Sequence, residues 1–173
     1  KTLDREIVEK FDVPRLIKEK ELLLSKTIDS NKTSFKSSTG SRLLSGNQQY
    51  ILNSETWIAE YFGYETAVLF TSGYQANLAL FSAMLDRNST VFYDEYCHAS
   101  IRDGIQLSHA RSRKFSNNNL DELEQLIKSF DGKAVVALEA LYSMDGTMPN
   151  ADRLKALKQN YDFYLLVDEA HSF

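Results

Sequence analysis

The chain has 173 residues, enough for one domain with a hydrophobic core, and its 43% hydrophobic and 25% charged residues are ordinary for a folded domain. The 20 basic and 24 acidic residues give a net charge of -4, which provides no electrostatic basis for binding nucleic acid. No apolar run is long enough to cross a bilayer, and a single cysteine excludes an internal disulfide. We therefore expect a cytoplasmic protein without a membrane span.

The first third of the chain is predicted to be mainly helical. Residues 1–38 contain two helical pieces divided at Pro14, followed by a polar loop. A second loop is predicted over 39–46, where glycines stand near both ends. Apolar periodicity over 48–62 predicts a helix, and Gly63 suits the left-handed conformation that often follows a helix.

From residue 64 onward, short apolar runs alternate with segments of helical periodicity. The predicted strands cover 67–70, 90–93, 111–115, 134–138 and 163–167. The predicted helices cover 73–85, 99–107, 119–130 and 151–159. This alternation predicts an α/β fold, a three-layer sandwich in which helices cover both faces of a mostly parallel sheet. The last strand is a continuous apolar run, so we expect it to be buried on both faces.

Polar residues that could bind a ligand follow four of these strands. Ser72 and Gly73 open a helix, where unpaired N–H groups and the helix dipole favour an anion, although Ser72 could instead serve only as the N-cap. His98 precedes another helix, where its imidazole could stack on a flat ligand or transfer a proton. Ser143 lies in a turn, and Asp168 and His171 end the chain's last strand.

Simpler explanations exist for some of these residues. Asp168-Glu-Ala-His171 resembles the acidic motif of helicase-like NTPases, but that reading needs a phosphate loop. The only Gly-Lys pair, Gly132-Lys133, is followed by alanine and lacks the first glycine of such a loop. A strand-end acid beside a surface histidine is the plainest alternative. Cys97 is expected to be a small buried residue rather than a nucleophile, and no metal site is predicted.

We expect the four groups to lie close together, because the carboxyl ends of parallel strands meet at one edge of a sheet. They would supply a helix start for a phosphate, an imidazole for stacking, a hydroxyl, and an acid–histidine pair. A planar, phosphorylated, nitrogen-containing cofactor would use each of these groups. Pyridoxal phosphate (PLP) has this chemistry.

From about Thr39 onward the sequence resembles the α-oxoamine synthases, the acyl-CoA-dependent branch of the fold-type I PLP enzymes. Five motifs occur in the family's order and spacing: Gly40-Ser-Arg-Leu-Leu-Ser-Gly46, Ser72-Gly-Tyr-Gln-Ala-Asn77, His98-Ala-Ser-Ile-Arg-Asp-Gly104, Glu139-Ala-Leu-Tyr-Ser-Met-Asp-Gly146 and Val167-Asp-Glu-Ala-His171. The resemblance implies the large domain of a fold-type I enzyme, with an active site built across a homodimer interface.

The resemblance also implies a role for each candidate residue. The start of the helix at Ser72, Gly73 and Tyr74 would hold the cofactor phosphate through backbone amides. His98 would stack on the pyridine ring and orient the substrate carboxylate.

The remaining candidates would bind the edge of the cofactor ring. Ser143 and His171 would bond its phenolic oxygen, and Asp168 would pair with the pyridine nitrogen. A carboxylate there favours the pyridinium form, which withdraws electrons from the substrate. His98, Asp168 and His171 are thus the expected catalytic residues.

The reaction implied by the resemblance joins an amino acid to an acyl-CoA and releases CoA and carbon dioxide. L-Alanine and pimeloyl-CoA, the pair used in biotin biosynthesis, are the favoured substrates. Serine with palmitoyl-CoA, or the substrates of another family member, are the alternative. A non-catalytic subunit that retains the fold is the alternative of another class.

Three departures from the family pattern shape a further expectation. The Schiff-base lysine of the family lies beyond the Asp-x-Ala-His motif, the family's Asn-Asp-Tyr-Leu-Gly segment is missing, and Ile51 stands where many members have histidine. We therefore expect part of a longer protein, inactive alone. Residues 1–38 would be an N-terminal helical segment, and residues 39–173 the first part of the cofactor-binding large domain, without its remainder or the small domain.

Overall fold

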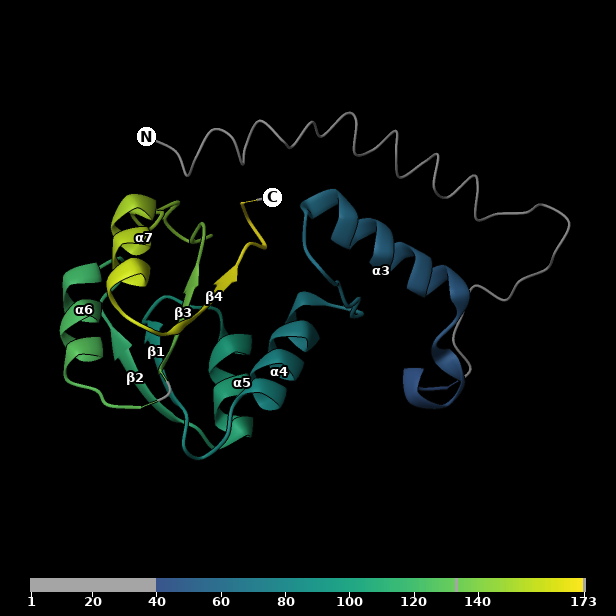
Figure 1. Cartoon of the computed structure of the whole chain (residues 1–173), viewed down its shortest axis with the longest axis horizontal. Helices are drawn as coiled ribbons and strands as arrows, with labels where there is room; N and C mark the ends of the chain where they lie inside the picture. The colour runs from purple at the N-terminus through teal and green to yellow at the C-terminus, as the bar shows by residue number, and fades with distance from the viewer. Residues whose placement is uncertain (1–39, 133, 173) are drawn as a thin grey trace, which may run out of the picture. The chain divides into compact units, whose positions relative to one another are not determined.

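A computed structural model of the chain describes residues 40–132 and 134–172. They form two compact units, a smaller one ending at Phe70 and a larger one beginning at Thr71 (Figure 1). The helices predicted within residues 1–38 lie outside the described residues. None of the helices in the described ranges combines the length and the apolar character needed to span a membrane.

The described residues of the smaller unit, 40–70, form one long helix and a short helical turn before it. Helix α3 spans Gln49–Phe62 and ends at Gly63, whose φ of 71° is left-handed as predicted. The loop predicted over 39–46 is partly wrong, because Arg42–Gly46 forms a single π-helical turn, η1. Three successive N–H groups in this turn donate to the carbonyl oxygen of Ser41, which explains its wide winding.

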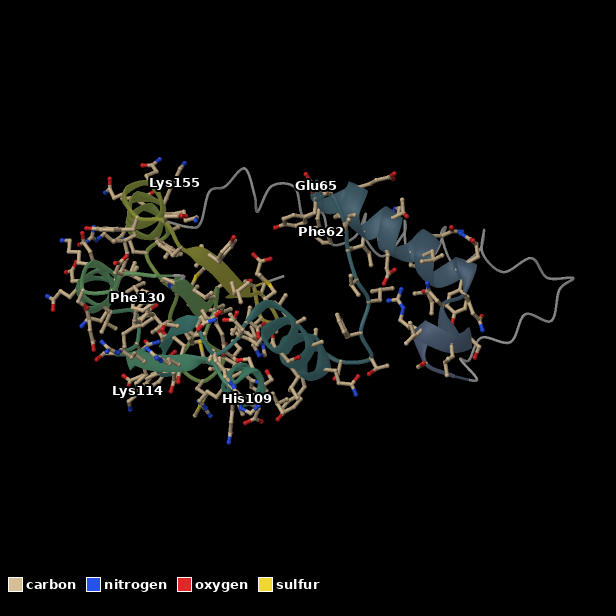
Figure 2. All side chains as sticks on the ribbon, turned by 60° about the horizontal axis from the view of Figure 1, so that its bottom comes forward. Phe62, Glu65, His109, Lys114, Phe130 and Lys155 are labelled. Carbon is tan, nitrogen blue, oxygen red and sulfur yellow. The ribbon has the colours of Figure 1, made fainter. Side chains whose placement is uncertain are left out.

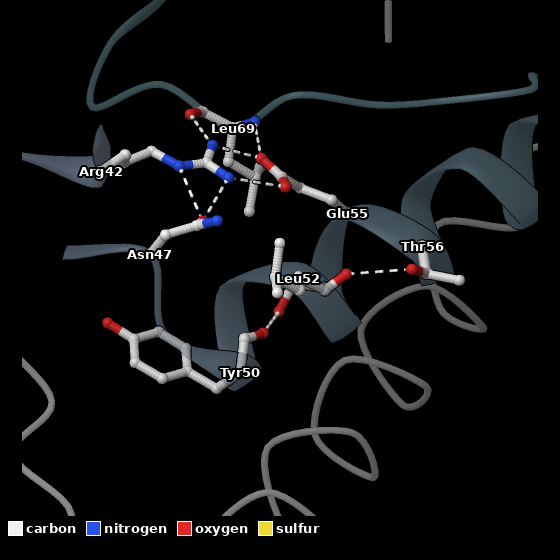
Figure 3. A network of polar contacts seen from close by, with 8 residues as sticks. Arg42, Asn47, Tyr50, Leu52, Glu55, Thr56 and Leu69 are labelled. Atoms are coloured by element: carbon white, nitrogen blue, oxygen red, sulfur yellow. Dashed lines mark hydrogen bonds and ion pairs between the residues drawn. The ribbon is translucent and has the colours of Figure 1, made fainter. Parts of the chain in front are cut away.

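The strand predicted over 67–70 is wrong, because these residues pair with no strand within the described ranges. An ion pair holds this segment instead (Figure 3). The Arg42 guanidinium donates to both carboxylate oxygens of Glu55 at 2.5 and 2.8 Å, and the backbone N–H of Leu69 donates to the same carboxylate at 2.7 Å. The bonds from Arg42 hold the pKa of Glu55 below its usual range.

The larger unit is built around a parallel sheet with the strand order β2-β1-β3-β4. The strands span Thr90–Asp94 (β1), Arg111–Phe115 (β2), Ala134–Glu139 (β3) and Tyr164–Asp168 (β4). The helices span Gly73–Met84 (α4), Ala99–Ser108 (α5), Leu120–Lys128 (α6) and Ala151–Asn160 (α7). This arrangement confirms the predicted α/β fold with a parallel sheet.

Two hydrophobic cores, one on each face of the sheet, produce the three layers (Figure 1). Val135 and Ala137 of β3 face α4 and α5, whereas Val136 and Leu138 face α6 and α7. All six residues of β3 are buried, as expected for an inner strand covered by helices on both faces. In the core on the α6 and α7 side, the Phe130 ring, labelled in Figure 2, packs edge to face against Phe92 with 5.7 Å between ring centroids.

The prediction that the last strand is buried on both faces is wrong. Strand β4 is an edge strand among the described residues, and its Tyr164 and Val167 are 54% and 42% exposed. A continuous apolar run shows that a strand can be buried, but it does not specify which strands will cover its edges.

Candidate functional site

The carboxyl edge of the sheet carries a cavity of ≈ 140 Å³, entirely within the larger unit. Its lining comes from the start of α4, the start of α5 and the segments after β3 and β4: Gly73, Tyr74, Asn77, His98, Ser100, Glu139, Ser143, Asp168, Ala170 and His171. Every site residue named from the sequence lines this cavity, except Ser72. The polar groups that follow separate strands are therefore brought together.

The first turn of α4 forms one wall. Ser72 is the N-cap, and its hydroxyl accepts a hydrogen bond from the N–H of Gln75 at 3.2 Å. Gly73 and Tyr74 occupy the first two positions of the helix, so their N–H groups have no carbonyl acceptor within the helix itself. Apart from its chain neighbours and the backbone of its own helix, no atom lies within 4 Å of the position a Cβ would take on Gly73, so there is open space beside this residue.

His98 lies at the start of α5 and is held on three sides. Its backbone N–H donates to the Glu139 carboxylate at 2.7 Å. Its ring nitrogen Nδ1 accepts from the backbone N–H of Ser100 at 3.2 Å and lies 2.8 Å from the Ser100 hydroxyl. The Tyr74 ring stands perpendicular to the imidazole, with 6.1 Å between ring centroids.

Asp168 ends β4, directly opposite Glu139 in the parallel register. One oxygen of its carboxylate accepts from the side-chain amide of Asn77 at 2.8 Å, and the other accepts from the backbone N–H of Ala170 at 3.0 Å. Its backbone carbonyl accepts from the N–H of Ala140 at 2.9 Å. Hydrogen bonds therefore fix both the main chain and the carboxylate of Asp168.

Glu139 places a second carboxylate beside Asp168. Burial raises the pKa of Glu139, an effect that the hydrogen bond from the His98 N–H partly offsets. No role for this residue was predicted from the sequence, although a charged residue that ends an apolar strand is a usable signal. Asn77 and Ser100 were also missed; both lie within helices, α4 and α5, and neither stands at the end of a strand.

Ser143 and His171 complete the cavity from the loops after β3 and β4, and both side chains are exposed. Cys97 does not line the cavity. It is 1% exposed, and burial raises its pKa, which agrees with the prediction that it is a small core residue rather than a nucleophile.

The chemistry of this arrangement is specific. It combines a helix start suited to an anion, a flat imidazole, a hydroxyl, a second imidazole and a fixed carboxylate. The cavity is smaller than the about 300–1,000 Å³ typical of complete ligand pockets.

Comparison with known proteins places the chain in a family. The family model of aminotransferases of classes I and II matches residues 13–172. The 8-amino-7-oxononanoate synthase of Chromobacterium violaceum is 41% identical over 137 residues, which are 79% of this chain and 36% of that protein. Serine palmitoyltransferase 2 of Kluyveromyces lactis is 38% identical over 146 residues, 78% of this chain and 26% of that protein.

Similarity to a solved structure supports the same family. A serine palmitoyltransferase from S. paucimobilis, with bound PLP and myriocin, superposes with a TM-score of 0.76 at 30% identity, covering 95% of this chain and 41% of that one. The chain thus spans well under half the length of each of these relatives. The chain belongs to the aminotransferase class I and II family, in its α-oxoamine synthase branch.

Proposed function

We propose that the protein containing this chain is a PLP-dependent acyltransferase that condenses an amino acid with an acyl-CoA and releases CoA and carbon dioxide. The observation that carries the proposal is the convergence of Gly73, His98, Ser143, Asp168 and His171 on one cavity. These residues come from four separate segments, and together they offer groups suited to the phosphate, the ring face, the ring oxygen and the pyridine nitrogen of PLP.

The cavity fits this cofactor. The N–H groups of the first turn of α4 would receive the phosphate, and the lack of a side chain on Gly73 leaves room beside this helix start. The Asp168 carboxylate, held by two N–H groups, would accept from the pyridine nitrogen and favour its protonated form. Ser143 and His171 would bond the ring oxygen, and the His98 imidazole would pack on the ring face.

The bound cofactor would supply an electron sink for the charge that develops on the substrate's α-carbon. The residues of this chain would orient the cofactor and the substrate and would stabilise the protonated pyridine nitrogen. Asp168 would hold a proton on the pyridine nitrogen, and His98 would fix the ring plane and orient the substrate carboxylate. The Schiff-base lysine would lie outside the 173 residues, so the proposed activity belongs to the longer protein.

The favoured substrates are L-alanine and pimeloyl-CoA, as in the 8-amino-7-oxononanoate synthases of biotin biosynthesis, because a relative of that name is 41% identical. Serine with palmitoyl-CoA is the second candidate, supported by similarity to serine palmitoyltransferases. A non-catalytic subunit is disfavoured, since Asp168, His171 and His98 are all retained. On the same resemblance, we propose that the protein acts as a cytoplasmic homodimer.

A titration of the complete protein with PLP, followed by absorbance, tests the cofactor. Asp168→Ala should weaken binding strongly, whereas Asp162→Ala, an exposed acid just before the same strand, should not. Equal affinities in the two variants would contradict the assigned role of Asp168.

Product analysis tests the substrates. The complete enzyme would be given alanine or serine with acyl-CoAs of different length, and the products identified by mass spectrometry. Condensation with none of these pairs would rule out both candidate activities.

A further inference from the structure

One side chain joins the two halves of the cavity. The amide of Asn77, on α4, donates to the Asp168 carboxylate at 2.8 Å and to the Ser100 hydroxyl at 3.0 Å. A carboxylate only accepts hydrogen bonds, so the NH₂ end of the amide must face Asp168. Both amide hydrogens are therefore used, and they connect residues of β4 and α5.

Ser100 passes this connection to His98. The Ser100 side chain is fully buried, and its oxygen accepts from Asn77, which leaves its own proton for His98 Nδ1 at 2.8 Å. The backbone N–H of Ser100 also points to Nδ1, at 3.2 Å. A backbone N–H can only donate, so Nδ1 must act as an acceptor. A neutral imidazole with this pattern carries its proton on Nε2.

We propose that Asn77 is a positioning residue that holds Asp168 and, through Ser100, the His98 ring as one hydrogen-bonded unit, with His98 in the Nε2–H tautomer. The inference rests on the proposed function for its consequence. A carboxylate bound to the pyridine nitrogen and an imidazole packed on the ring must keep a fixed relative orientation. Asn77 provides that link, since β4 and α5 come from distant parts of the sequence.

Three variants of the complete protein test the unit. Asn77→Leu removes both donors, and Ser100→Ala removes the hydroxyl but keeps the backbone N–H. Ser108→Ala is the matched control, because Ser108 is a buried serine on the same helix whose hydroxyl donates to Ile105 outside the cavity. Circular dichroism checks that each variant folds; if Asn77→Leu does not fold, Ser100→Ala decides the question.

The first readout needs no cofactor. In the ¹⁵N spectrum of histidine-labelled, cofactor-free protein, assigned with His98→Gln, the ring should show an unprotonated Nδ1 and a protonated Nε2. Asn77→Leu and Ser100→Ala should move both signals toward the average of a tautomer mixture, and Ser108→Ala should not. Unchanged signals in both variants would overturn the proposal.

The second readout is PLP affinity. Loss of one hydrogen bond to a charged group should weaken binding by about tenfold in Asn77→Leu, and Ser108→Ala should match the unmodified protein. Affinity equal to that of the control would also overturn the proposal. If the unmodified protein binds no PLP, the proposed function fails, and the ¹⁵N comparison alone decides whether Asn77 holds the unit together.

Discussion

Replacing Gly104 with alanine should destabilise the protein, although the same change usually stabilises a helix. Gly104 lies inside α5 where α4 crosses it. An added Cβ would lie 2.9 Å from the Cβ of Phe81, 3.0 Å from the carbonyl oxygen of Asn77 and 3.3 Å from the Cα of Leu78. Two of these atoms are backbone, so α4 cannot relieve the overlap by turning a side chain and must move.

The two opposing effects set the expected size. Alanine gains about 1 kcal/mol over glycine in a helix interior. Overpacking a closed interface costs about 1–3 kcal/mol, and the upper half of that range applies because a whole helix must shift. The free energy of unfolding should therefore fall by about 1–2 kcal/mol. Because α4 carries Asn77 and the helix start at Gly73, the affinity for PLP should fall as well.

Urea unfolding followed by circular dichroism measures the first effect, and absorbance titration with PLP measures the second. Ser82→Ala, on the exposed side of α4, is the control and should change neither quantity appreciably. A Gly104→Ala protein as stable as the unmodified one, with unchanged PLP affinity, would refute the claim that α4 and α5 are held at this distance.

Three further changes have defined outcomes. Glu55→Gln should destabilise the protein at neutral pH, and urea midpoints should show the stability difference from the unmodified protein shrinking in acid. Arg42 lowers the pKa of Glu55, so the stability that the ionised carboxylate contributes is full above its ordinary pKa of 4.5 and is lost as the pH falls through the folded-state pKa. Leu157→Ala, at a fully buried position, should cost about 2–5 kcal/mol in the same assay, and a loss below about 1 kcal/mol would contradict the described core. His98→Phe should keep PLP binding, because a flat ring remains, but lower turnover by about 10²-fold through loss of orientation; steady-state kinetics would contradict this if turnover were unchanged.

Local signals in the sequence predicted most of the larger unit. The α6 start illustrates why: Asn119 accepts a hydrogen bond from the N–H of Glu122, and both residues are recognisable in the sequence. The prediction of a strand over 67–70 was wrong because a strand also needs a neighbouring strand to pair with, and composition does not show whether one is present. The prediction that β4 is buried was wrong for the same reason, since the position of β4 in the sheet order is a property of the whole fold.

The candidate site divides along similar lines. Residues at or shortly after the carboxyl ends of strands, such as Asp168 and His98, could be predicted because the topology of a parallel sheet brings them to one edge. Asn77 and Ser100 could not, because their importance comes from the crossing of α4 and α5, which no local pattern specifies. The sequence therefore predicted residues that line the cavity, and it did not predict the two side chains that hydrogen-bond to them.

The buried thiol of Cys97 gives the α4–α5 layer a natural chemical probe. The side chain is 1% exposed, lies 3.5 Å from the Ala137 carbonyl oxygen, and has a raised pKa, so the closed layer should not react with alkylating reagents. Modification must wait until this layer separates from the sheet. The rate of labelling at Cys97 would thus measure how often the helices that carry Asn77 and Ser100 open, a motion that an unfolding curve of the whole protein averages away.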